Sequence, residues 1–470
     1  MSIINNMPTK GGMTINGVIE EYYAYAGQTI SPGDFVKFVN GIAEYKNYGT
    51  VAADTIADSR SGYPSSYSLE MPNGQVVYID GDSIDPVSFY LLEFTNVEIN
   101  IVATASIPAT YDNPYYPCLI DDTRFFLPLS YQDNALDYKI YGMVVQVTNN
   151  TITLGTISSL YTVSSGGSYK PLQAFLCSDG HVTVLSHNSD SEHSWYYSIY
   201  TINGTTFTTY KGQTSITDFY SGNYYKGISM GNDKFLITRW ASGEGTGMDG
   251  VHCQVMTLTY GVPSWGTITP ISDAEKAEYG ANFDYGYNKV FFTIAGTSYK
   301  LLGVAGTVSG TTITVGAEKE LSSQTYRAYT MLPKIISSSK VVVAFGISNQ
   351  SGCGAMVVNL SGDTIYPATM YNLSTTGGTL MDSTEITQLS NPNLFRTFYY
   401  EGTKVPYIRK NQVFLINGDV VTKTIATSEY EIQVQKATTK DCNGVAKTGG
   451  TGGNSTSHKD KIQVYTPNTN

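Results

Sequence analysis

Charge is scarce in this chain, and positive charge is the scarcer kind. Charged residues make up 14% of the 470 positions, only six of them are arginines, and the formal net charge is −11. Affinity for nucleic acid depends mainly on Lys and Arg side chains that neutralise phosphates, so the sequence argues against a nucleic-acid partner. The same acidic balance argues against binding to an anionic membrane surface.

Cysteine is also scarce, and its positions are isolated. The five cysteines are Cys118, Cys177, Cys253, Cys353 and Cys442. Their number is odd and no C-x-x-C pair occurs, so they indicate neither a disulfide framework nor a zinc site. We therefore expect buried free thiols in a protein made in a reducing cytosol.

Long apolar segments are missing as well. The chain has no run of 18 apolar residues, so it predicts no membrane-spanning helix. The N-terminal stretch MSIINNMPTKGG lacks the apolar segment of a secretory signal. We therefore expect neither membrane insertion nor secretion.

The chain is rich in glycine and tyrosine, and it has enough apolar material for an ordered core. It holds 46 Gly and 38 Tyr, and 41% of its residues are hydrophobic. This composition favours many strands and turns over long solvated helices. The chain is too long for one ordinary core, which predicts several domains or a repeat architecture.

The central region repeats one pattern: an apolar strand, a tight turn and a short Thr-rich strand. YKIYGMVVQVTNNTITLGT and YKLLGVAGTVSGTTITVGA are two copies. Asn-Gly and related pairs between β-rich runs indicate hairpins, because both turn residues adopt positive φ. The turns recur every 48–58 residues, at Asn96, Asn149, Asn203, Gly261, Ser309, Ser361 and Asn417.

An even period of this length, made of four short strands, is typical of a β-propeller blade. The seven turns predict an all-β chain with a seven-bladed propeller from about Asn73 to about Thr427. Six or eight blades are alternatives, and a large β-sandwich is the rival fold. Apolar runs such as DTRFFLPLS and SKVVVAFG are interpreted as the first strand of each unit, covered on both faces by neighbouring blades.

The two ends of the chain carry separate, shorter β segments. Because a propeller closes as a ring, its entry and exit points lie close together, and the flanking segments can form one domain. We predict a split terminal β domain from residues 1–60 and 428–470, a linker at 61–72, and a propeller at 73–427 inserted between the two halves.

The end segments also carry a family resemblance. AGQTISPGDFVKFVNG at 26–41, with KATTKDCNGVAKTGG and DKIQVYTP near the C-terminus, resembles the termini of structural proteins from phages of clostridia and related bacteria. The pairing of a GDFV strand with a GVAKT strand is similar to that of small capsid-decoration proteins with a β-tulip fold. The resemblance implies a small split β-barrel or β-tulip-like terminal domain that attaches the protein to a phage particle.

Two acidic segments are candidates for metal binding, and each has a simpler interpretation. DGDSID places Asp80, Asp82 and Asp85 in one loop, as calcium loops do, but Leu91 stands where such a loop has its closing Glu. A solvated turn is the simpler interpretation. HNSDSEH is interpreted as an exposed blade loop, although its side chains include metal-ligand types: His187, Asp190, Glu192 and His193.

No catalytic motif stands out. SDGHVT at Ser178 to Thr183 resembles the Asp-box turn of sialidase-like propellers, but it lacks the spacing and the closing Trp, so we interpret it as a hairpin turn. The sequence has no G-x-S-x-G element and no P-loop. Paired carboxylates for glycoside hydrolysis would have to come from distant blades. We therefore expect a protein that is not an enzyme, with no catalytic residue, cofactor or metal site assigned.

Four pairs of tyrosines are candidates for a recognition surface at blade edges. Tyr supplies rigid amphipathic area, which suits the binding of a glycan or a protein. Alternation along a strand puts one member of each pair inward. The pairs are Tyr115–Tyr116, Tyr196–Tyr197, Tyr224–Tyr225 and Tyr399–Tyr400.

Repeat and resemblance together predict a bacteriophage virion structural protein of the capsid-decoration type, on the surface of the particle. Its terminal domain would contact the major capsid protein, and the decoration proteins that it resembles imply a homotrimer. Two alternatives stay open. One is a tail-fibre or baseplate protein that contacts tail proteins and recognises a host-surface glycan, and the other is a propeller glycosidase that acts on cell-surface glycans.

Overall fold

The structure is a computed structural model, and it divides the chain into two compact units. One unit consists of Met1–Gly49 and Thr424–Asn470, and the other of Thr50–Lys423. Strands and turns make up the described residues, which include no helix that could cross a membrane. The described residues are 3–8, 14–24, 29–30, 35–50, 54–60, 65–81, 86–94, 99–108, 113–134, 137–161, 169–188, 195–216, 223–241, 250–273, 281–296, 300–347, 352–374, 380–381, 386–389, 392–401, 407–436, 444–446, 450–451 and 461–467.

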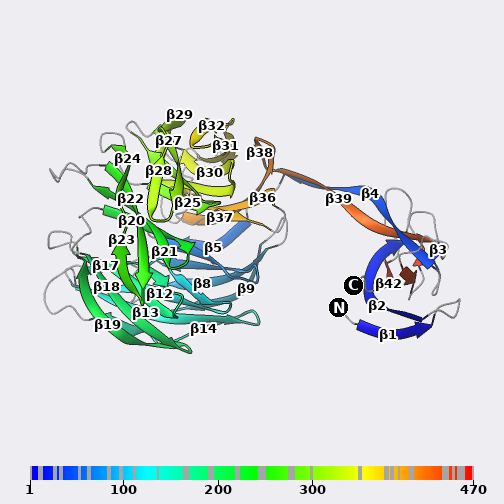
Figure 1. The fold of residues 1–470 in the computed structure, drawn as a ribbon, viewed down its shortest axis with the longest axis horizontal. Helices are drawn as coiled ribbons and strands as arrows, with labels where there is room; N and C mark the ends of the chain where they lie inside the picture. Colours follow the sequence, from blue (N-terminus) through cyan, green and yellow to red (C-terminus); the bar gives the residue numbers. More distant parts are fainter. Residues whose placement is uncertain are drawn as a thin grey trace. The chain divides into compact units, whose positions relative to one another are not determined.

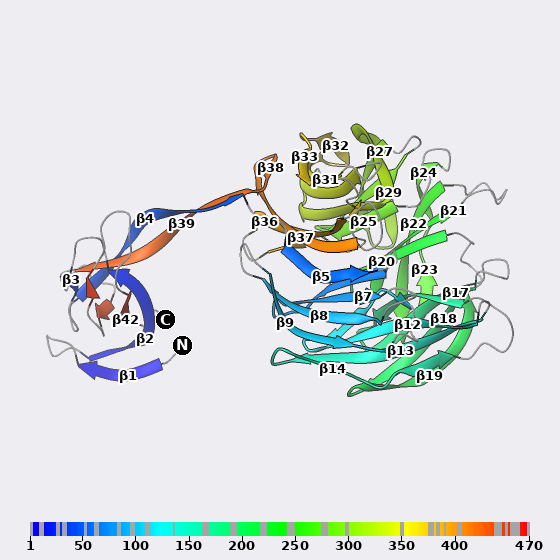
Figure 2. The ribbon, with the colours of Figure 1, turned by 180° about the vertical axis from the view of Figure 1, so that it is seen from behind.

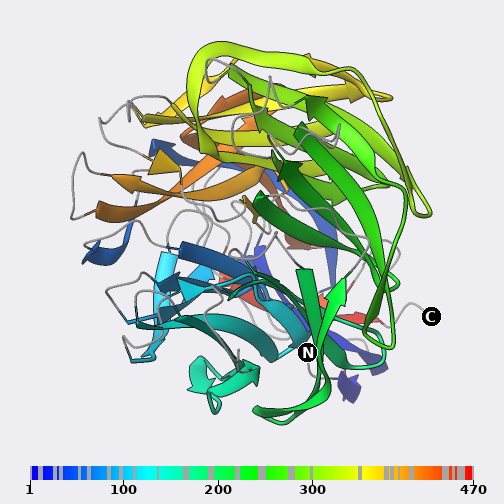
Figure 3. The same ribbon diagram turned by 90° about the vertical axis from the view of Figure 1, so that its left-hand side faces the viewer.

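The larger unit is a β-propeller of seven blades, and Figure 3 shows its sheets around a common centre. The predicted all-β fold and the predicted blade number are confirmed. Blade 1 contains β6 (Ser65–Glu70), β7 (Val76–Gly81), β8 (Ser88–Phe94) and β9 (Ile99–Ser106). Blade 2 contains β10 (Asn113–Pro114), β11 (Cys118–Asp121), β12 (Arg124–Asn134), β13 (Asp137–Thr148), β14 (Thr151–Leu154) and β15 (Ser158–Tyr161).

The next two blades follow the same order from the centre outward. Blade 3 contains β16 (Tyr169–Leu176), β17 (His181–Asn188), β18 (Trp195–Asn203) and β19 (Thr206–Ile216). Blade 4 contains β20 (Asn223–Gly231), β21 (Lys234–Ala241), β22 (Gly250–Thr259), β23 (Val262–Trp265) and β24 (Thr269–Asp273).

The last three blades include a strand that two blades share. Blade 5 contains β25 (Ala281–Gly286), β26 (Lys289–Ala295), β27 (Lys300–Ser309), β28 (Thr312–Val315) and the first part of β29 (Lys319–Ser337). Blade 6 contains the rest of β29, β30 (Lys340–Ile347), β31 (Gly352–Ser361), β32 (Thr364–Pro367) and β33 (Tyr371–Ser374). Blade 7 contains β34 (Leu380–Met381), β35 (Thr387–Gln388), β36 (Leu394–Glu401), β37 (Tyr407–Asn417) and β38 (Val420–Thr422).

The second strand of a blade is buried on both faces. In β12, Phe125 and Leu127 pack against blade 1, whereas Phe126 packs against blade 3. All three side chains are fully buried. Successive side chains of a strand point to opposite faces, so a strand between two neighbouring blades is apolar at every position. The expected covering on two faces is confirmed, but these strands are the second of their blades and not the first.

The hairpin turns between third and fourth strands lie where the sequence predicts them in blades 2 to 7. Both turn residues have positive φ in blades 2 and 4, as expected, for example 49° at Asn149. In blades 3, 5, 6 and 7 only the glycine does, for example 58° at Gly204. The turn predicted at Asn96 lies outside the described residues.

A strand from the N-terminal side closes the ring. In blades 2, 4 and 6, the third strand pairs with one short strand near its end and with another near its start. In blade 7 the third strand, β37, pairs with β38 and with β5 (Asp54–Arg60) in the same two places. β5, in blue, lies beside β37, in orange, in two opposite views (Figure 1, Figure 2). The last blade therefore combines strands from both ends of the propeller segment.

This closure corrects the boundaries expected from the sequence. Residues 54–60, assigned to the terminal domain, pair within blade 7, and the expected linker at 61–72 contains β6 of blade 1. On the C-terminal side the units divide after Lys423. The sequences of β5 and β6, DTIADSR and SSYSLE, carry little of the apolar alternation that marks a strand.

A repeated polar contact joins neighbouring blades. A basic residue at the start of a second strand donates a hydrogen bond to the carbonyl oxygen of the glycine in the next blade's hairpin turn. The pairs are Arg124–Gly204 at 2.7 Å, Lys289–Gly362 at 3.1 Å and Lys340–Gly418 at 2.8 Å. Each contact ties the inner half of one blade to the outer half of the next.

The smaller unit is built from both ends of the chain. β2 (Thr14–Ala24) pairs with β42 (Lys461–Pro467), and β4 (Phe35–Thr50) pairs with β40 (Gly444–Ala446). The strands follow the order β2-β39-β4-β40-β42, in which β39 spans Thr424–Lys436. Because β42 also pairs with β2, this is the strand order of a closed barrel. β1 (Ile3–Pro8) extends it at β2, and β3 (Thr29–Ile30) pairs with β41 (Gly450–Thr451). The β-tulip likeness stays a prediction.

Replacing residues 54–60 by a Gly-Ser segment of equal length should lower the thermal unfolding midpoint of the propeller. Blade 7 would lose its pairing with β5, and the ring would open there. We expect a decrease of roughly 5 °C by scanning calorimetry, because each kcal/mol lost moves the midpoint of a large domain by a few degrees. The same replacement at residues 3–8, in β1, is the control. Equal propeller midpoints in the two variants would contradict the closing role of β5.

The variant Lys289→Met should destabilise the propeller by about 2 kcal/mol, the size expected for hydrogen bonds to a charged group that is largely buried. Its ammonium contacts Thr307 Oγ1 and Asp363 Oδ1, both at 2.8 Å, and 16% of its side chain is exposed. Lys300→Met is the matched control, since its pairing with Glu320 leaves 46% of the lysine side chain exposed. That pair should contribute less than about 1 kcal/mol. Urea denaturation measures both, and an equal loss in the two variants would contradict the prediction.

Candidate functional site

Inner strands of blades 1 to 4 surround a cavity of about 470 Å³ at the centre of the propeller. A parallel bridge between Tyr116 and Gln173 shows that neighbouring inner strands run in the same direction. The volume falls within the range of small-molecule sites. The lining residues are Tyr67, Ser68, Leu69, Glu70, Tyr116, Pro117, Cys118, Leu119, Gln173, Ala174, Phe175, Leu176, Gly227, Ile228, Ser229 and Phe235.

Two tyrosines form an aromatic wall of the cavity. The rings of Tyr67 and Tyr116 lie edge to face, with centroids 4.6 Å apart and planes inclined by 67°. Pro117 cannot donate to a strand ladder, and the inner strand of blade 2 is split there into β10 and β11. The split leaves Tyr116 beside blade 3, where its carbonyl oxygen accepts a hydrogen bond from the Ala174 N–H at 3.2 Å.

The adjoining part of the wall is fixed by a side chain that bridges blades 3 and 4. The Gln173 amide donates to the Gly227 carbonyl oxygen and accepts from the Gly227 N–H, both at 2.7 Å. A Cβ atom on Gly227 would lie 2.7 Å from Phe175 and from Ile237, so only glycine fits there. Phe175 packs edge to face on Phe235 with centroids 4.7 Å apart. Gln173 is therefore a rigid part of the wall.

The polar groups of the cavity differ in what they can do chemically. Glu70, the last residue of β6, is exposed and is the one charged side chain in the described lining. Ser68 and Ser229 add hydroxyl groups. Burial, and to a lesser degree the nearby Cys177, raise the pKa of the Cys118 thiol, so Cys118 is neutral at physiological pH and a poor nucleophile.

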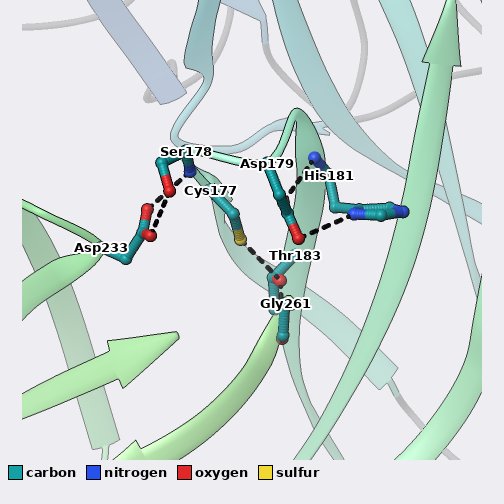
Figure 4. Close-up of polar contacts among 7 residues, drawn as sticks. All are labelled: Cys177, Ser178, Asp179, His181, Thr183, Asp233 and Gly261. Carbon is teal, nitrogen blue, oxygen red and sulfur yellow. Dashed lines mark hydrogen bonds and ion pairs between the residues drawn. The ribbon is translucent and has the colours of Figure 1, made fainter. Parts of the chain in front are cut away.

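The SDGHVT segment forms a tight turn between β16 and β17, as the sequence predicts, and Figure 4 shows its polar contacts. Asp233 of blade 4 accepts hydrogen bonds from the Ser178 N–H and hydroxyl. Asp179 pairs with His181 at 3.1 Å. The Thr183 hydroxyl donates to the Gly261 carbonyl oxygen at 2.9 Å. These contacts join blades 3 and 4, so the segment is a junction between blades.

A buried thiol completes this junction. Cys177 Sγ lies 3.7 Å from Thr183 Oγ1. Burial raises the pKa of Cys177 to about 11, with the carboxylates of Asp179 and Asp233 adding to the effect of burial. Cys177, Cys253 and Cys353 are buried free thiols, and Cys118 is half-buried. Cys442 lies outside the described residues.

The metal candidates from the sequence do not form a site in the described part of the chain. Asp80 lies in β7 and is fully buried, whereas Asp82 and Asp85 lie outside the described residues. The side chain of His187 also lies outside the described residues, and so do Asp190, Glu192 and His193. No cluster of three metal-ligating side chains occurs among the described residues.

The structure places the tyrosines of the four pairs in different surroundings. Tyr116 lines the central cavity and not a blade edge, and Tyr197 is buried with 5% of its surface exposed. The side chains of Tyr224–Tyr225 and Tyr399–Tyr400 lie outside the described residues. Sequence reasoning missed Tyr67, Glu70 and Gln173, because it did not recognise the inner strands that carry them. The signal available was the short polar-aromatic run that precedes each apolar strand.

No family model matches the sequence, and no curated protein matches it. Among solved structures, the chain is similar to a protein of Bacteroides uniformis provisionally assigned as a 6-phosphogluconolactonase: identity is 11%, 74% of this chain and 94% of that chain are covered, and the TM-score is 0.48. A polysaccharide lyase described as an ulvan lyase gives 12% identity, 82% and 98% coverage, and a TM-score of 0.45. Trypanosoma rangeli sialidase is 10% identical, with 77% of this chain and 59% of that chain covered and a TM-score of 0.39.

These comparisons correct two expectations. The solved structures named here are described as enzymes: a provisionally assigned lactonase, a polysaccharide lyase and a sialidase. Neither a family model nor a curated protein links the chain to a phage protein. The expectation of a phage virion structural protein is therefore wrong, and so is the expectation that enzymatic function is absent. At such low identities the likeness itself shows the propeller fold, so the reaction has to be argued from the cavity.

Replacing Gln173 with Leu should cost about 2 kcal/mol of unfolding free energy, because the buried Gly227 N–H and carbonyl would lose their partners. Gln388→Leu is the matched control, since it removes one exposed hydrogen bond, from Gln388 Nε2 to the Pro392 carbonyl oxygen. The control should change stability by less than about 0.5 kcal/mol. Urea denaturation followed by tyrosine fluorescence measures both. A Gln173→Leu variant as stable as the unmodified protein would contradict the bracing role.

Proposed function

We propose that the propeller is a carbohydrate-acting domain and that the central cavity is its saccharide site. The single observation that carries the proposal is the pair of tyrosines in a cavity of about 470 Å³ that also offers hydroxyls and a carboxylate. A ligand site of this kind is an apolar cavity with a few placed polar groups.

The aromatic wall suits the chemistry of a sugar ring. A pyranose presents patches of C–H bonds on its faces and hydroxyl groups around its edge. Tyrosine has an apolar ring face and a polar hydroxyl, so it can cover a C–H patch and hydrogen-bond a neighbouring hydroxyl. Tyr67 and Tyr116 come from different blades and pack on each other at 67°, so together they offer one angled aromatic surface to a sugar.

Glu70 is the side chain that we assign to proton transfer. A carboxylate can accept a proton from an acidic C–H or from an attacking water, and can return it to a leaving oxygen. Hydrolysis with two carboxylates would need a second acid about 5–10 Å away. Glu70 is the one carboxylate in the described lining, so we favour a reaction that starts with a single general base, such as elimination or lactone hydrolysis.

Binding and turnover are tested separately. The purified protein should retain saccharides on a glycan array. Tyr67→Ala should weaken that binding roughly five- to thirtyfold, because an aromatic contact of this kind contributes about 1–2 kcal/mol. Glu70→Gln should reduce turnover of the best-bound saccharide by about a hundredfold, the usual size of a general-base contribution. Glu320→Gln is the control for removal of an exposed carboxylate on another blade. Binding without turnover would contradict the role of Glu70, and no saccharide binding would contradict the proposal.

A further inference from the structure

Exposed tyrosines occur on four consecutive blades of the propeller. Among the described residues, the exposed aromatic side chains are all tyrosines, and blades 3 to 6 each carry one. Their exposed fractions are 60% for Tyr210, 72% for Tyr260, 65% for Tyr287 and 55% for Tyr366. A single exposed aromatic residue is ordinary, but a set that recurs from blade to blade indicates a surface that contacts something.

All four tyrosines lie toward one end of the propeller. Because strands within a blade alternate in direction, the turn between the first two strands and the turn between the last two lie at the same end. Tyr260 and Tyr287 lie in such turns, and Tyr366 follows one by two residues. The ring of Tyr210 packs on His181, which ends the first turn of blade 3, with centroids 4.3 Å apart. We call the turns of blades 3 to 6 at this end, with the four tyrosines, the turn surface.

Contacts between blades bring Tyr210 and Tyr260 to the same junction. The Thr183 hydroxyl of blade 3 donates a hydrogen bond at 2.9 Å to the carbonyl oxygen of Gly261, the residue after Tyr260 (Figure 4). Thr183 is two residues from His181, on which the Tyr210 ring packs. The His181 contact therefore holds one face of the Tyr210 ring beside the turn that carries Tyr260.

A second junction joins the turns of Tyr287 and Tyr366 in the same way. The ammonium of Lys289, two residues after Tyr287, donates to the Gly362 carbonyl oxygen at 3.1 Å and to Asp363 Oδ1 at 2.8 Å. Gly362 lies in the turn that precedes Tyr366. The four rings are thus mounted on turns that the blade contacts hold in place.

Two of the tyrosines occupy backbone positions that disfavour tyrosine. The φ angle is 50° at Tyr260 and 56° at Tyr287, each the first of two turn residues with positive φ. The equivalent residue in two other turns is asparagine, at Asn149 and Asn232, which tolerates this conformation far better than a bulky side chain does. Both tyrosine side chains are mostly exposed, so burial does not offset the strain. Strain that folding does not repay points to a role in binding.

The charges of these turns balance one another. The ion pair of Lys289 with Asp363 measures 2.8 Å, and His181 lies 3.1 Å from Asp179. The other turn residues are mostly Ser, Thr, Asn and Gly. The described turns of blades 3 to 6 contain three carboxylates, Asp179, Asp233 and Asp363, and three lysines, Lys234, Lys289 and Lys340.

We propose that the turn surface binds an uncharged polysaccharide, which lies across the tyrosines of blades 3 to 6. None of the four tyrosines belongs to the described lining of the central cavity. The inference therefore goes beyond the proposed function, and either can fail without the other.

Charge and shape favour this ligand. A surface whose charges already balance offers no net attraction to an anionic or a cationic polymer, so the complementary partner is uncharged. The tyrosines are separate rings divided by polar turns, and a polysaccharide presents one C–H face after another with hydroxyl groups between them. Tyrosine rings can cover the C–H faces, while Ser, Thr and Asn side chains can hydrogen-bond the hydroxyl groups.

An array of uncharged polysaccharides (glucans, mannans, galactans and xylans) tests the proposal on the full chain. We expect retention on at least one of them, with less than a twofold change between 50 and 500 mM salt. Tyr260→Asn and Tyr287→Asn should each weaken retention roughly fivefold, the size of one aromatic contact. Each should also raise the thermal unfolding midpoint by about 1–2 °C, because asparagine relieves the strain at positive φ.

Two control variants separate this surface from the rest of the propeller. Ile101→Thr removes an exposed apolar side chain on blade 1 and should leave retention unchanged. Tyr67→Ala alters the central cavity and should change the retention of polymers less than twofold. If it abolishes that retention instead, the polymer binds in the cavity, so this inference is wrong and the proposed function stands.

Three further results would overturn the inference. The first is no retention on any uncharged polysaccharide, or retention that both asparagine variants keep. The second is a preference for polygalacturonate or chitosan, the anionic and cationic polymers on the same array. The third is a loss of self-association in the asparagine variants, measured by light scattering, without a loss of polysaccharide retention, which would make the surface a protein interface. A lower unfolding midpoint in both variants would contradict the argument from strain.

Discussion

Burial of each blade between two neighbours is the constraint on which the rest of this propeller depends. The second strands are apolar on both faces, so a blade without a neighbour would expose one of them to water. A linear stack would leave such a face at each end, whereas a ring leaves none. The pairing of β5 with β37 completes that ring, and the contacts from Arg124, Lys289 and Lys340 to the next blade's turn add directional bonds at three of the junctions.

The cavity is a consequence of the same arrangement. Strands nearest the axis have a neighbouring blade on only part of their surface, and β11 accordingly is half-buried along its whole length. The side chains of these strands do not fill the space around the propeller axis, which leaves room for a ligand. The walls are nevertheless stiff, because the Gln173–Gly227 bridge and the Phe175–Phe235 contact hold blades 3 and 4 together. A stiff cavity loses little entropy when a ligand binds.

The sequence predicts the parts of the fold that have a strong local signal. The turns at Asn149 and Asn203 stand out because few residue types tolerate positive φ, and the period of these turns predicts the number of blades. The inner strands and β5 have a weak signal, because they are partly polar and depend on pairing with strands far along the chain. The site was missed for the same reason: Tyr67 and Gln173 lie about 100 residues apart, and they line one cavity only when blades 1 to 3 stand side by side. The functional prediction was wrong for a different reason: it rested on a resemblance of the terminal segments, which carries no information about the centre of the propeller.

A crystal structure of the protein soaked with an oligosaccharide tests the central claim most directly. We predict a sugar ring in the cavity, against the wall formed by Tyr67 and Tyr116, with a polar substituent within hydrogen-bond distance of Glu70. A saccharide bound with clear density elsewhere on the propeller, with the cavity occupied by water alone, would contradict it.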